Sequence, residues 1–313
     1  MLTDPNALSV VICTHNPRPD YFTRCLKALE TQTLAVDKWE LLLVNNASDA
    51  GKEPRPDLSW HLHARLVCEP RLGLTPARLL GIREATGGLL VFVDDDNVLD
   101  ADFLEMALRV SKEKPFLGSW SGQCRPAFEE KPPEWTRRYW GNLVIRQFDE
   151  DVWSNLPRLP DSMPCGAGLC VRRGVALHYL HLHESGKRSF QFDRTPDTLL
   201  SGGDNDLAAC ACDIGLGVGL IASLKLTHLI SPERLTEDYL VRLTEGIFFS
   251  AVILDHVRSS SPGLKSYKVR WHEPLRMLLA GSSHRRIQLA CLRGRRRGLK
   301  FVGSFDKQCS RVL

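Results

Sequence analysis

Short apolar segments alternate with amphipathic ones along the first hundred residues. Four apolar segments of five or six residues have the composition of strands buried on both faces. They span residues 8–13, 40–44, 64–68 and 89–93. Between them, apolar positions three and four apart predict a helix from Asp20, its cap, to Leu29, and Pro76 suits the first turn of another helix that stops at Gly87. This order predicts an α/β fold with a Rossmann-like, mostly parallel central sheet flanked by helices.

The pattern changes in the second half of the chain. Residues 129–164 are rich in Pro and Trp and weakly periodic, which predicts a long irregular segment. Strand or loop signals return at 165–171 and 217–226. Thr236 then caps a long predicted helix that carries two acids in its first turn. We therefore predict two parts, a sheet domain over residues 1–235 and a helical, basic C-terminal extension over residues 236–313.

Composition excludes several classes of protein. The 313 residues are 43% hydrophobic and 25% charged, which is typical of a globular protein and not of a disordered or fibrous one. No uncharged apolar stretch reaches the roughly 18 residues of a membrane span. Asp4 and Pro5 stand where a targeting signal would be basic, so we expect a cytoplasmic protein. The ten cysteines lie mostly in apolar runs, and their spacing predicts reduced core thiols rather than zinc ligands.

Charge is unevenly distributed. The net charge is +4, but residues 258–300 carry 12 Lys and Arg against one acid, which leaves the remaining residues at a net −7. A solvated end explains this tail most simply. A nucleic-acid patch, a nuclear signal and a membrane-surface anchor are the alternatives. Of these we favour peripheral contact with the inner face of the membrane, and no nucleic-acid partner is expected. Arg276, Arg285 and Arg286 there interleave with apolar residues: Trp271, Leu275, Met277, Leu278, Leu279, Ile287 and Leu289.

Three adjacent carboxylates follow the fourth predicted strand. Asp94, Asp95 and Asp96 repel one another unless a cation or hydrogen-bond donors occupy the site. Mg²⁺ or Mn²⁺ typically uses one or two carboxylates together with substrate phosphates, and Asp94 and Asp96 have a suitable spacing. The alternative is a solvated acidic turn, or a capping cluster for a helix that starts at Asp100.

Two further segments carry candidate chemistry. Paired glycines before Asp204 let the backbone approach a ligand, and an aspartate carboxylate there can accept the proton of a hydroxyl group. The alternative is an ordinary helix cap. His228 follows a predicted strand, where a single histidine is more often structural than a ligand. A second group, His178, His181 and His183, does not share one face of a helix and is predicted to be structural or solvent-facing.

Five segments, in order, resemble the family 2 glycosyltransferases, which are inverting enzymes of the GT-A fold. The resemblance covers residues 8 to 246. It rests on the runs Val10–Asn16, Leu43–Asp49, Gly73–Asp96 with its DXD motif, Cys165–Arg173 and Gly203–Leu207. It implies that residues 1–235 form a GT-A domain.

The resemblance also implies roles for individual residues. Asp94 would contact the donor or the metal, Asp96 and His228 would bind the metal, and Asp204 would be the general base. Further donor contacts would be Thr14, Asn16, Arg18, Asn46, Arg78 and Asp95. Candidates on the acceptor side are Gly166, Gly203, Asp206 and Trp140. Asn45 and Asn46 replace the family's usual acidic pair, and an amide both donates and accepts, so the nucleobase stays open.

The implied reaction moves a sugar from a nucleoside-diphosphate sugar to an acceptor hydroxyl in one displacement assisted by Mn²⁺ or Mg²⁺. The acceptor would be a glycan, a polysaccharide or a lipid-linked molecule. One alternative is a haloacid-dehalogenase-like phosphatase that uses Asp94 and Asp96, although Ala208 stands where its second motif needs an acid. The other is a nucleotide-sugar-binding scaffold without turnover.

Overall fold

The computed structural model describes residues 7–156, 161–188, 190, 192, 199–258 and 281–309. Its contacts divide the chain into two compact units. The sheet unit comprises Met1–Glu129, Val144–Gln191 and Gly203–Ile230. The helical unit comprises Glu130–Leu143, Phe192–Gly202 and Ser231–Leu313. Two internal segments thus group with the C-terminal helices, and the domain boundary at residue 235 stays a prediction.

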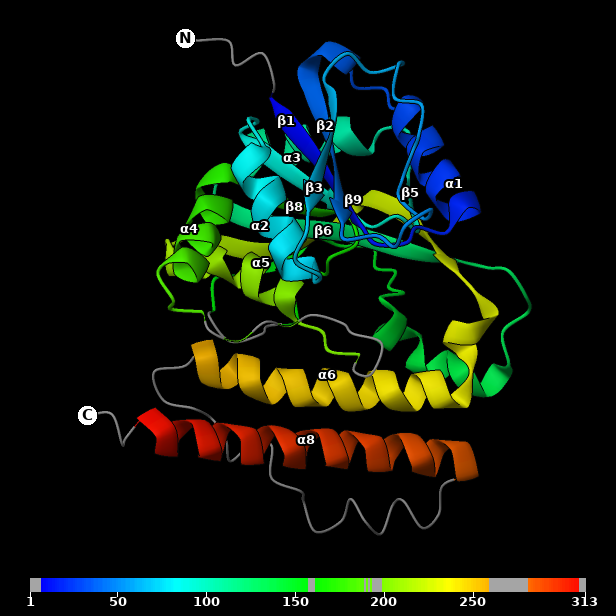
Figure 1. Ribbon diagram of the computed structural model, residues 1–313, viewed down its shortest axis with the longest axis vertical. Helices are drawn as coiled ribbons and strands as arrows, with labels where there is room; N and C mark the ends of the chain where they lie inside the picture. The colour runs from blue at the N-terminus through cyan, green and yellow to red at the C-terminus, as the bar shows by residue number, and fades with distance from the viewer. Residues whose placement is uncertain are drawn as a thin grey trace. The chain divides into compact units, whose positions relative to one another are not determined.

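The sheet unit holds nine strands and five α-helices among its described residues (Figure 1). The strands are β1 (Leu8–Thr14), β2 (Trp39–Asn46), β3 (Ala64–Glu69), β4 (Leu89–Val93), β5 (Asn97–Leu99), β6 (Leu117–Phe128), β7 (Val152–Ser154), β8 (Leu169–Arg172) and β9 (Gly217–Ile230). The helices are α1 (Pro19–Glu30), α2 (Leu74–Glu84), α3 (Phe103–Glu113), α4 (Arg173–Glu184) and α5 (Gly203–Asp213), with a short 3₁₀ turn η1 (Val36–Lys38).

The sheet has the order β3-β2-β1-β4-β8-β6-β9-β5, and β7 pairs with β9 outside this path. The first four strands of this order, β3, β2, β1 and β4, are parallel to one another, as the apolar runs predicted. β8 enters antiparallel between β4 and β6, while β6 and β9 are parallel. The α/β class with a sheet flanked by helices is confirmed. Parallel pairing dominates the first half of the sheet, and the sheet as a whole is mixed.

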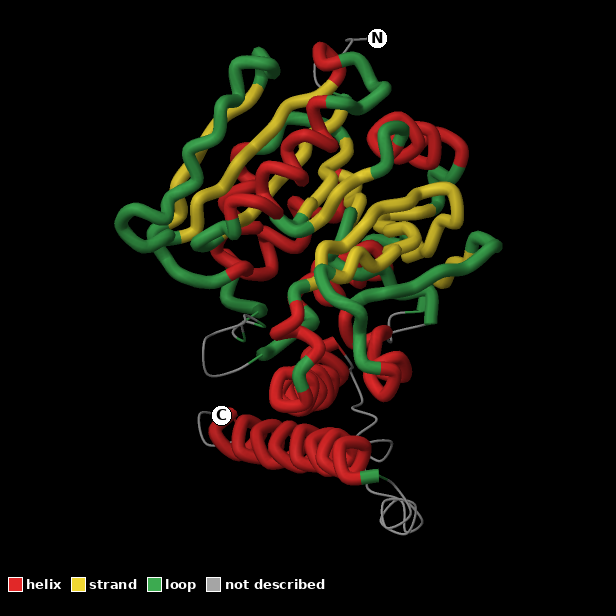
Figure 2. The backbone as a smooth tube through the Cα atoms, turned by 90° about the vertical axis from the view of Figure 1, so that its right-hand side faces the viewer, coloured by secondary structure: helices red, strands yellow, loops and turns green. Residues whose placement is uncertain are grey.

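Helices cover both faces of the sheet, which lies between them in Figure 2. On one face, α1 and α3 pack against strand residues such as Val10 and Leu41. The packing residues of these helices are Phe22, Leu26, Phe103 and Leu104. On the other, α2, α4 and α5 pack through Ile82, Tyr179 and Leu207 against Val11 and Leu42. Strands covered on both faces bury every side chain, and this explains why β1, β2 and β4 are continuous apolar runs.

Two elements have no clear sequence signal. β6 contains no β-branched residue, so its strand conformation comes from its neighbours β8 and β9. A Cβ on Gly122 would lie 2.1 Å from the Leu224 carbonyl oxygen, so only glycine lets β6 and β9 approach so closely. α4 carries all three histidines of the predicted structural group, and His178 Nε2 lies 3.7 Å from Asp213 Oδ2.

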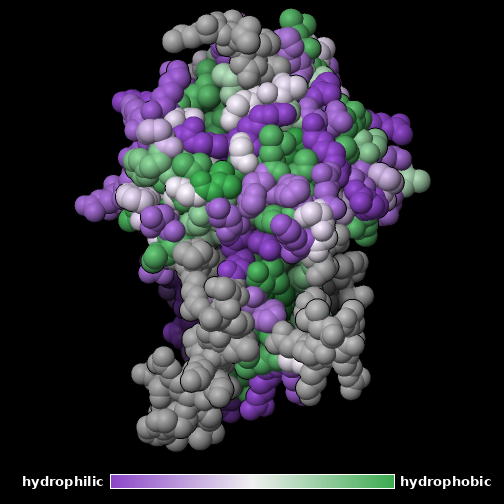
Figure 3. All heavy atoms as spheres, turned by 90° about the vertical axis from the view of Figure 1, so that its left-hand side faces the viewer, coloured by the Kyte–Doolittle hydropathy of each residue, from purple (hydrophilic) through white to green (hydrophobic). Residues whose placement is uncertain are grey.

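The described part of the helical unit contains two 3₁₀ segments, η2 (Glu134–Leu143) and η3 (Pro232–Leu235), and two long helices, α6 (Glu237–Arg258) and α8 (Ser282–Cys309). Thr236 Oγ1 accepts a hydrogen bond from the Tyr239 N–H at 3.3 Å, and this confirms the predicted cap of α6. Across the described ranges, no helix has the length and apolarity needed to cross a bilayer. Figure 3 shows one face of the molecule, where hydrophobic side chains form small areas between hydrophilic ones.

Candidate functional site

The carboxyl ends of β1 and β4 place the acidic cluster. These two strands are parallel neighbours, so Thr14 and the segment that starts at Asp94 emerge at the same sheet edge. The Thr14 hydroxyl donates a hydrogen bond to Asp95 Oδ2. From α1, the Cys25 thiol donates to the Asp94 carbonyl oxygen at 3.6 Å. The end of β1 and helix α1 therefore both hold this cluster.

Asp96, the last residue of the acidic cluster, faces His228. β5 and β9 pair antiparallel with Asn97 opposite His228, which brings His228 Nε2 to 3.3 Å from Asp96 Oδ2. The Asn97 amide donates to Asp96 Oδ1 at 2.8 Å. Both side chains of the facing pair are buried. The sequence placed these two residues in one metal site by resemblance, and the structure brings them together.

Asp204 lies at the start of α5, after Gly202 in the left-handed region with φ of 105°. Its Oδ2 accepts a hydrogen bond from the Gly166 N–H at 2.6 Å. A Cβ on Gly166 would lie 3.0 Å from Arg78 Nη2 and 3.2 Å from Asp204 Oδ2. Because position 166 has no side chain, the Arg78 guanidinium and the Asp204 carboxylate can both lie close to the backbone of Gly166.

Arg78 connects this carboxylate to the acidic cluster. It projects from α2 and is only 5% exposed. Burial by itself lowers the pKa of the Arg78 guanidinium, but the charges of Asp204 and Asp94 outweigh this and raise it above the ordinary value. Burial also raises the pKa of the nearby Cys13 thiol to about 12, with Arg78 opposing the shift. A buried cation thus faces carboxylates from two distant parts of the chain.

The loops after β1 and β2 are tied together at the same edge. Asn16 Nδ2 donates to Asp49 Oδ2 at 2.9 Å, and the Asp49 N–H donates to Asn16 Oδ1 at 2.8 Å. The Asn16 N–H donates to Ser48 Oγ at 3.0 Å. Asn16 and Ala47 both have a φ of 50°, which Asn tolerates but which costs Ala on the order of 1 kcal/mol. Positive φ angles of this kind are common where a loop is held in one conformation at a functional site.

Asn46 has a supporting place next to these loops. Its side-chain nitrogen donates to the Arg71 carbonyl oxygen at 2.7 Å, and its oxygen accepts the Gly73 N–H at 2.9 Å. The amide of this buried residue therefore holds the turn that leads into α2. Direct contact between Asn46 and the donor stays a prediction.

Arg18 lies at the rim of the site and makes two ion pairs. Its Nε lies 2.9 Å from Asp20 Oδ1, and its Nη2 pairs with Glu129. The guanidinium also lies 4.2 Å from the centre of the Tyr21 ring. Glu129 could not be predicted as a partner of Arg18, because no local pattern links the residue after β6 to the loop after β1.

The acceptor-side candidates differ in their surroundings. Gly166 and Gly203 lie beside Asp204, since one donates to its carboxylate and the other precedes it in α5. Asp206 instead lies 3.1 Å from Arg188 Nε, in an ion pair that is almost fully buried. Trp140 belongs to η2 in the helical unit, where its indole N–H donates to Thr136 Oγ1 at 3.1 Å. The sequence did not indicate Arg188.

We next compare the side chains of this site with the ligands that a divalent cation needs. Within the described ranges, no group of three or more His, Cys, Asp or Glu side chains is arranged to hold a metal ion. The pair Asp96 and His228 offers one carboxylate and one imidazole. A cation that takes few protein ligands and completes its coordination with water and substrate phosphates fits such a pair. The residues therefore suit a cation that binds together with a diphosphate.

Comparison with known proteins identifies the class. The model of "Glycosyl transferase family 2" matches residues 9–169, and this chain belongs to that family. The family membership predicted from the motifs is confirmed, and it replaces the haloacid-dehalogenase alternative.

The curated relatives match about a third of this chain. "Putative glycosyltransferase EpsH" from Bacillus subtilis is 27% identical over 116 residues, which are 36% of this chain and 32% of the relative. "Uncharacterized glycosyltransferase YibD" from Escherichia coli is 30% identical over 115 residues, 36% of this chain and 33% of the relative. "Glycosyltransferase GlyA" from Streptococcus pneumoniae is 32% identical over 107 residues, 34% of this chain and 15% of the relative. The match thus spans a third or less of each relative.

Solved structures support the fold. S. aureus TarS has a TM-score of 0.50 at 15% identity, over 89% of this chain and 49% of that protein. TarS 1–349 in complex with UDP has the same TM-score and identity, over 95% of this chain and 91% of that one. At this identity the likeness concerns the fold alone.

Proposed function

We propose that this chain is an inverting glycosyltransferase that moves a sugar from a nucleoside-diphosphate sugar to an acceptor hydroxyl. The observation behind the proposal is that buried Arg78 and Asp204 both lie beside Gly166, and that the charges of Asp204 and Asp94 both act on Arg78. It joins the strand-end acidic cluster and the Gly-Gly-Asp turn, which are far apart in sequence, into one site. Family membership supports the same reaction class.

In this proposal Asp204 is the general base. The Gly166 N–H holds Oδ2 of its carboxylate at 2.6 Å, so the side chain keeps one orientation. The acceptor oxygen attacks the anomeric carbon while the bond from that carbon to the diphosphate oxygen breaks, and Asp204 takes the hydroxyl proton. Attack from the face opposite the leaving group inverts the anomeric centre. Most of the rate gain would come from positioning and from stabilisation of charge.

The donor would occupy the edge formed by the ends of β1, β2 and β4. The tied loops at Asn16 and Asp49 present a fixed backbone for the nucleoside, and Thr14 fixes the Asp95 carboxylate beside it. Asp96 and His228 would hold Mn²⁺ or Mg²⁺, with Asp94 nearby, and the cation would supply neutralisation of the diphosphate charge. UDP is the first nucleotide to test, because the TarS neighbour was solved with it.

Asp204→Asn tests the proposal. We expect donor affinity close to that of the unchanged protein and turnover lower by roughly a hundredfold or more, the usual scale of general base catalysis. Release of nucleoside diphosphate from UDP-, GDP- and dTDP-sugars, with acceptor pools of glycan and lipid-linked type, measures this.

Asp213→Asn is the matched control, since it removes a carboxylate from the other end of the same helix. Equal turnover in Asp204→Asn and the control would remove Asp204 from the role. Tight donor binding without any transfer or donor hydrolysis by the unchanged protein would instead favour the non-catalytic scaffold.

A further inference from the structure

The helix α8 has an unusual charge pattern. From Ser282 to Ser304 it contains no Asp or Glu and seven basic residues, which are Arg285, Arg286, Arg293, Arg295, Arg296, Arg297 and Lys300. Seven like charges over about six turns repel one another, so the helix needs partners on at least one side. The contacts between α8 and α6 show how Arg286, Arg293 and Arg297 are neutralised.

One face of α8 is buried against α6 through small and apolar residues. A Cβ on Gly294 would lie 2.4 Å from the Glu245 carbonyl oxygen, and a Cβ on Gly298 would lie 2.7 Å from Val252 Cβ. Ile287, Ala290 and Val302 are buried on the same side. The two helices are therefore in close backbone contact, and this contact fixes the rotation of α8 about its own axis.

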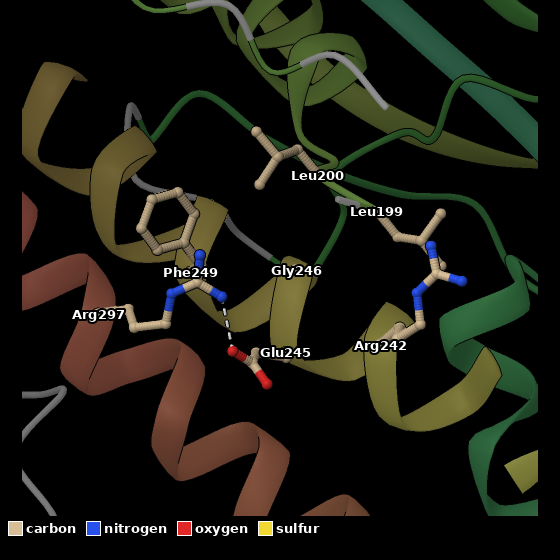
Figure 4. A pocket seen from close by; sticks show the side chains of 7 residues that line it. All are labelled: Leu199, Leu200, Arg242, Glu245, Gly246, Phe249 and Arg297. Atoms are coloured by element: carbon tan, nitrogen blue, oxygen red, sulfur yellow. Dashed lines mark hydrogen bonds and ion pairs between the residues drawn. The ribbon is translucent and has the colours of Figure 1, made fainter. Parts of the chain in front are cut away.

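Acidic residues of α6 neutralise the basic residues that flank this face. Arg286 lies 2.7 Å from Glu237 and 2.8 Å from Asp238. Arg293 and Arg297 both pair with Glu245, at 2.9 Å and 2.6 Å. Figure 4 shows the ion pair of Arg297 and Glu245 in a pocket between α6, α8 and residues 199–200. Phe249 and Arg242 also line this pocket. These ion pairs stabilise the packing of α8 against α6.

The opposite face of α8 has a different composition. Residues four, seven, eleven, fourteen and fifteen positions after Arg285 follow it along one stripe of a helix with 3.6 residues per turn. We call this the α8 stripe, and it consists of Arg285, Leu289, Leu292, Arg296, Leu299 and Lys300. Leu289 is 42% exposed, and Arg296 and Lys300 are exposed. Three leucines thus alternate with three cations on a face turned away from α6.

We propose that the α8 stripe binds the surface of a bilayer that contains anionic lipids, with the helix lying in the plane of the interface. Leucine side chains enter the boundary of the acyl chains while arginine and lysine head groups reach lipid phosphates, which is how basic amphipathic helices bind membranes. A second copy of the chain is a poor occupant because its stripe carries the same charge. The inference is independent of the transfer reaction.

The structure also corrects the residues predicted for this contact. Ile287 is 2% exposed and faces α6, and Arg286 is paired with Glu237 and Asp238, so neither can contact a membrane as predicted. Helical periodicity of α8 alone could not reveal this, since both of its faces contain apolar residues. The predicted contacts Trp271, Leu275, Arg276 and Met277 to Leu279 lie outside the described residues.

Vesicle flotation of the full chain tests the proposal. The probes are vesicles of phosphatidylcholine alone and of phosphatidylcholine with about 30% phosphatidylglycerol. We expect recovery with the anionic vesicles only, and its loss at about 0.5 M salt because screening shortens the reach of charge. Arg296→Gln with Lys300→Gln should weaken partitioning by about thirtyfold, and Leu289→Gln with Leu299→Gln by at least tenfold.

The matched control is Arg55→Gln with Lys112→Gln, which removes the same two charges from exposed positions of the sheet unit. It should float like the unchanged chain. Melting temperatures and UDP binding show that each variant is folded. Equal recovery on neutral and anionic vesicles, equal recovery of stripe and control variants, or displacement from vesicles by an equimolar single-stranded oligonucleotide would each overturn the proposal.

Discussion

Arg78 is the residue on which the candidate site depends most. Its guanidinium is buried on α2 and feels the charges of Asp94 and Asp204, while Gly166 leaves it room. Removing this buried cation takes a favourable charge away from both half-buried carboxylates, and this destabilises the fold. The resemblance had placed Arg78 at the donor. Its burial points to a positioning residue that sets the carboxylates.

Arg78→Gln should lower the free energy of unfolding by about 2 kcal/mol, because it removes a buried cation that favours two half-buried carboxylates. Combined with Asp204→Asn in a double-mutant cycle, it should show a coupling energy of about 1 kcal/mol or more. Chemical denaturation of the four proteins measures both quantities.

Arg83→Gln on the same helix is the control, since its ion pair with Glu184 is exposed and should change stability by less than about 0.5 kcal/mol. A coupling near zero would mean that Arg78 acts on the donor and not on Asp204.

At the same scale, the sequence predicted some site residues better than others. The acidic run after β4 and the Gly-Gly-Asp turn stand out because polar residues follow apolar strands or glycines. Arg188 beside Asp206 and Glu129 beside Arg18 could not be predicted, since each ion pair joins segments that only the fold brings together. Asn46 carries the right residue type, but its amide is used to support a turn.

Elements with strong local patterns were predictable and those imposed by neighbours were not. β4 begins and ends where the apolar run predicted, at Leu89 and Val93. The cap of α1 is wrong by two residues, because the helix begins at Pro19 after Arg18. β6 was missed entirely, because its glycines and serines have low strand propensity and its conformation is set by pairing with β9.

Gly122→Ala tests how β6 is held. The added Cβ would meet the Leu224 carbonyl oxygen at 2.1 Å, so the two strands must separate. We expect a loss of about 2–3 kcal/mol in the free energy of unfolding. Gly174→Ala in α4, where a Cβ has open space, should instead be neutral or stabilise by up to about 1 kcal/mol. Equal effects on urea denaturation would contradict the close approach of β6 and β9.

The whole molecule combines a slightly acidic body with a strongly basic helix. Alternating strand and helix signals were enough to predict the fold class, and the charge count was enough to predict a basic helical end. The grouping of residues 130–143 and 192–202 with the C-terminal helices could not be predicted, because composition does not tell which unit a segment packs with. Assignment of chain segments to units depends on long-range contacts that local patterns do not encode.

Ligand binding should be visible as stabilisation of the whole chain. A nucleoside diphosphate at one hundred times its Kd contributes about 2.7 kcal/mol to the native state, which raises the melting temperature by roughly 5 °C. With Mn²⁺ present we expect this shift for one nucleotide of a UDP, GDP and dTDP panel. Asp96→Ala should remove the part of the shift that needs Mn²⁺, while Asp57→Asn, an exposed carboxylate, keeps it. A full Mn²⁺-dependent shift in Asp96→Ala would contradict the metal assignment.

One guanidinium that serves two acids also limits how this protein can evolve. If either Asp94 or Asp204 became neutral, the buried Arg78 guanidinium would lose one of the two negative charges that favour it, and loss of Arg78 would remove a nearby cation from both acids. Substitutions at these three positions should therefore be correlated among descendants of this protein.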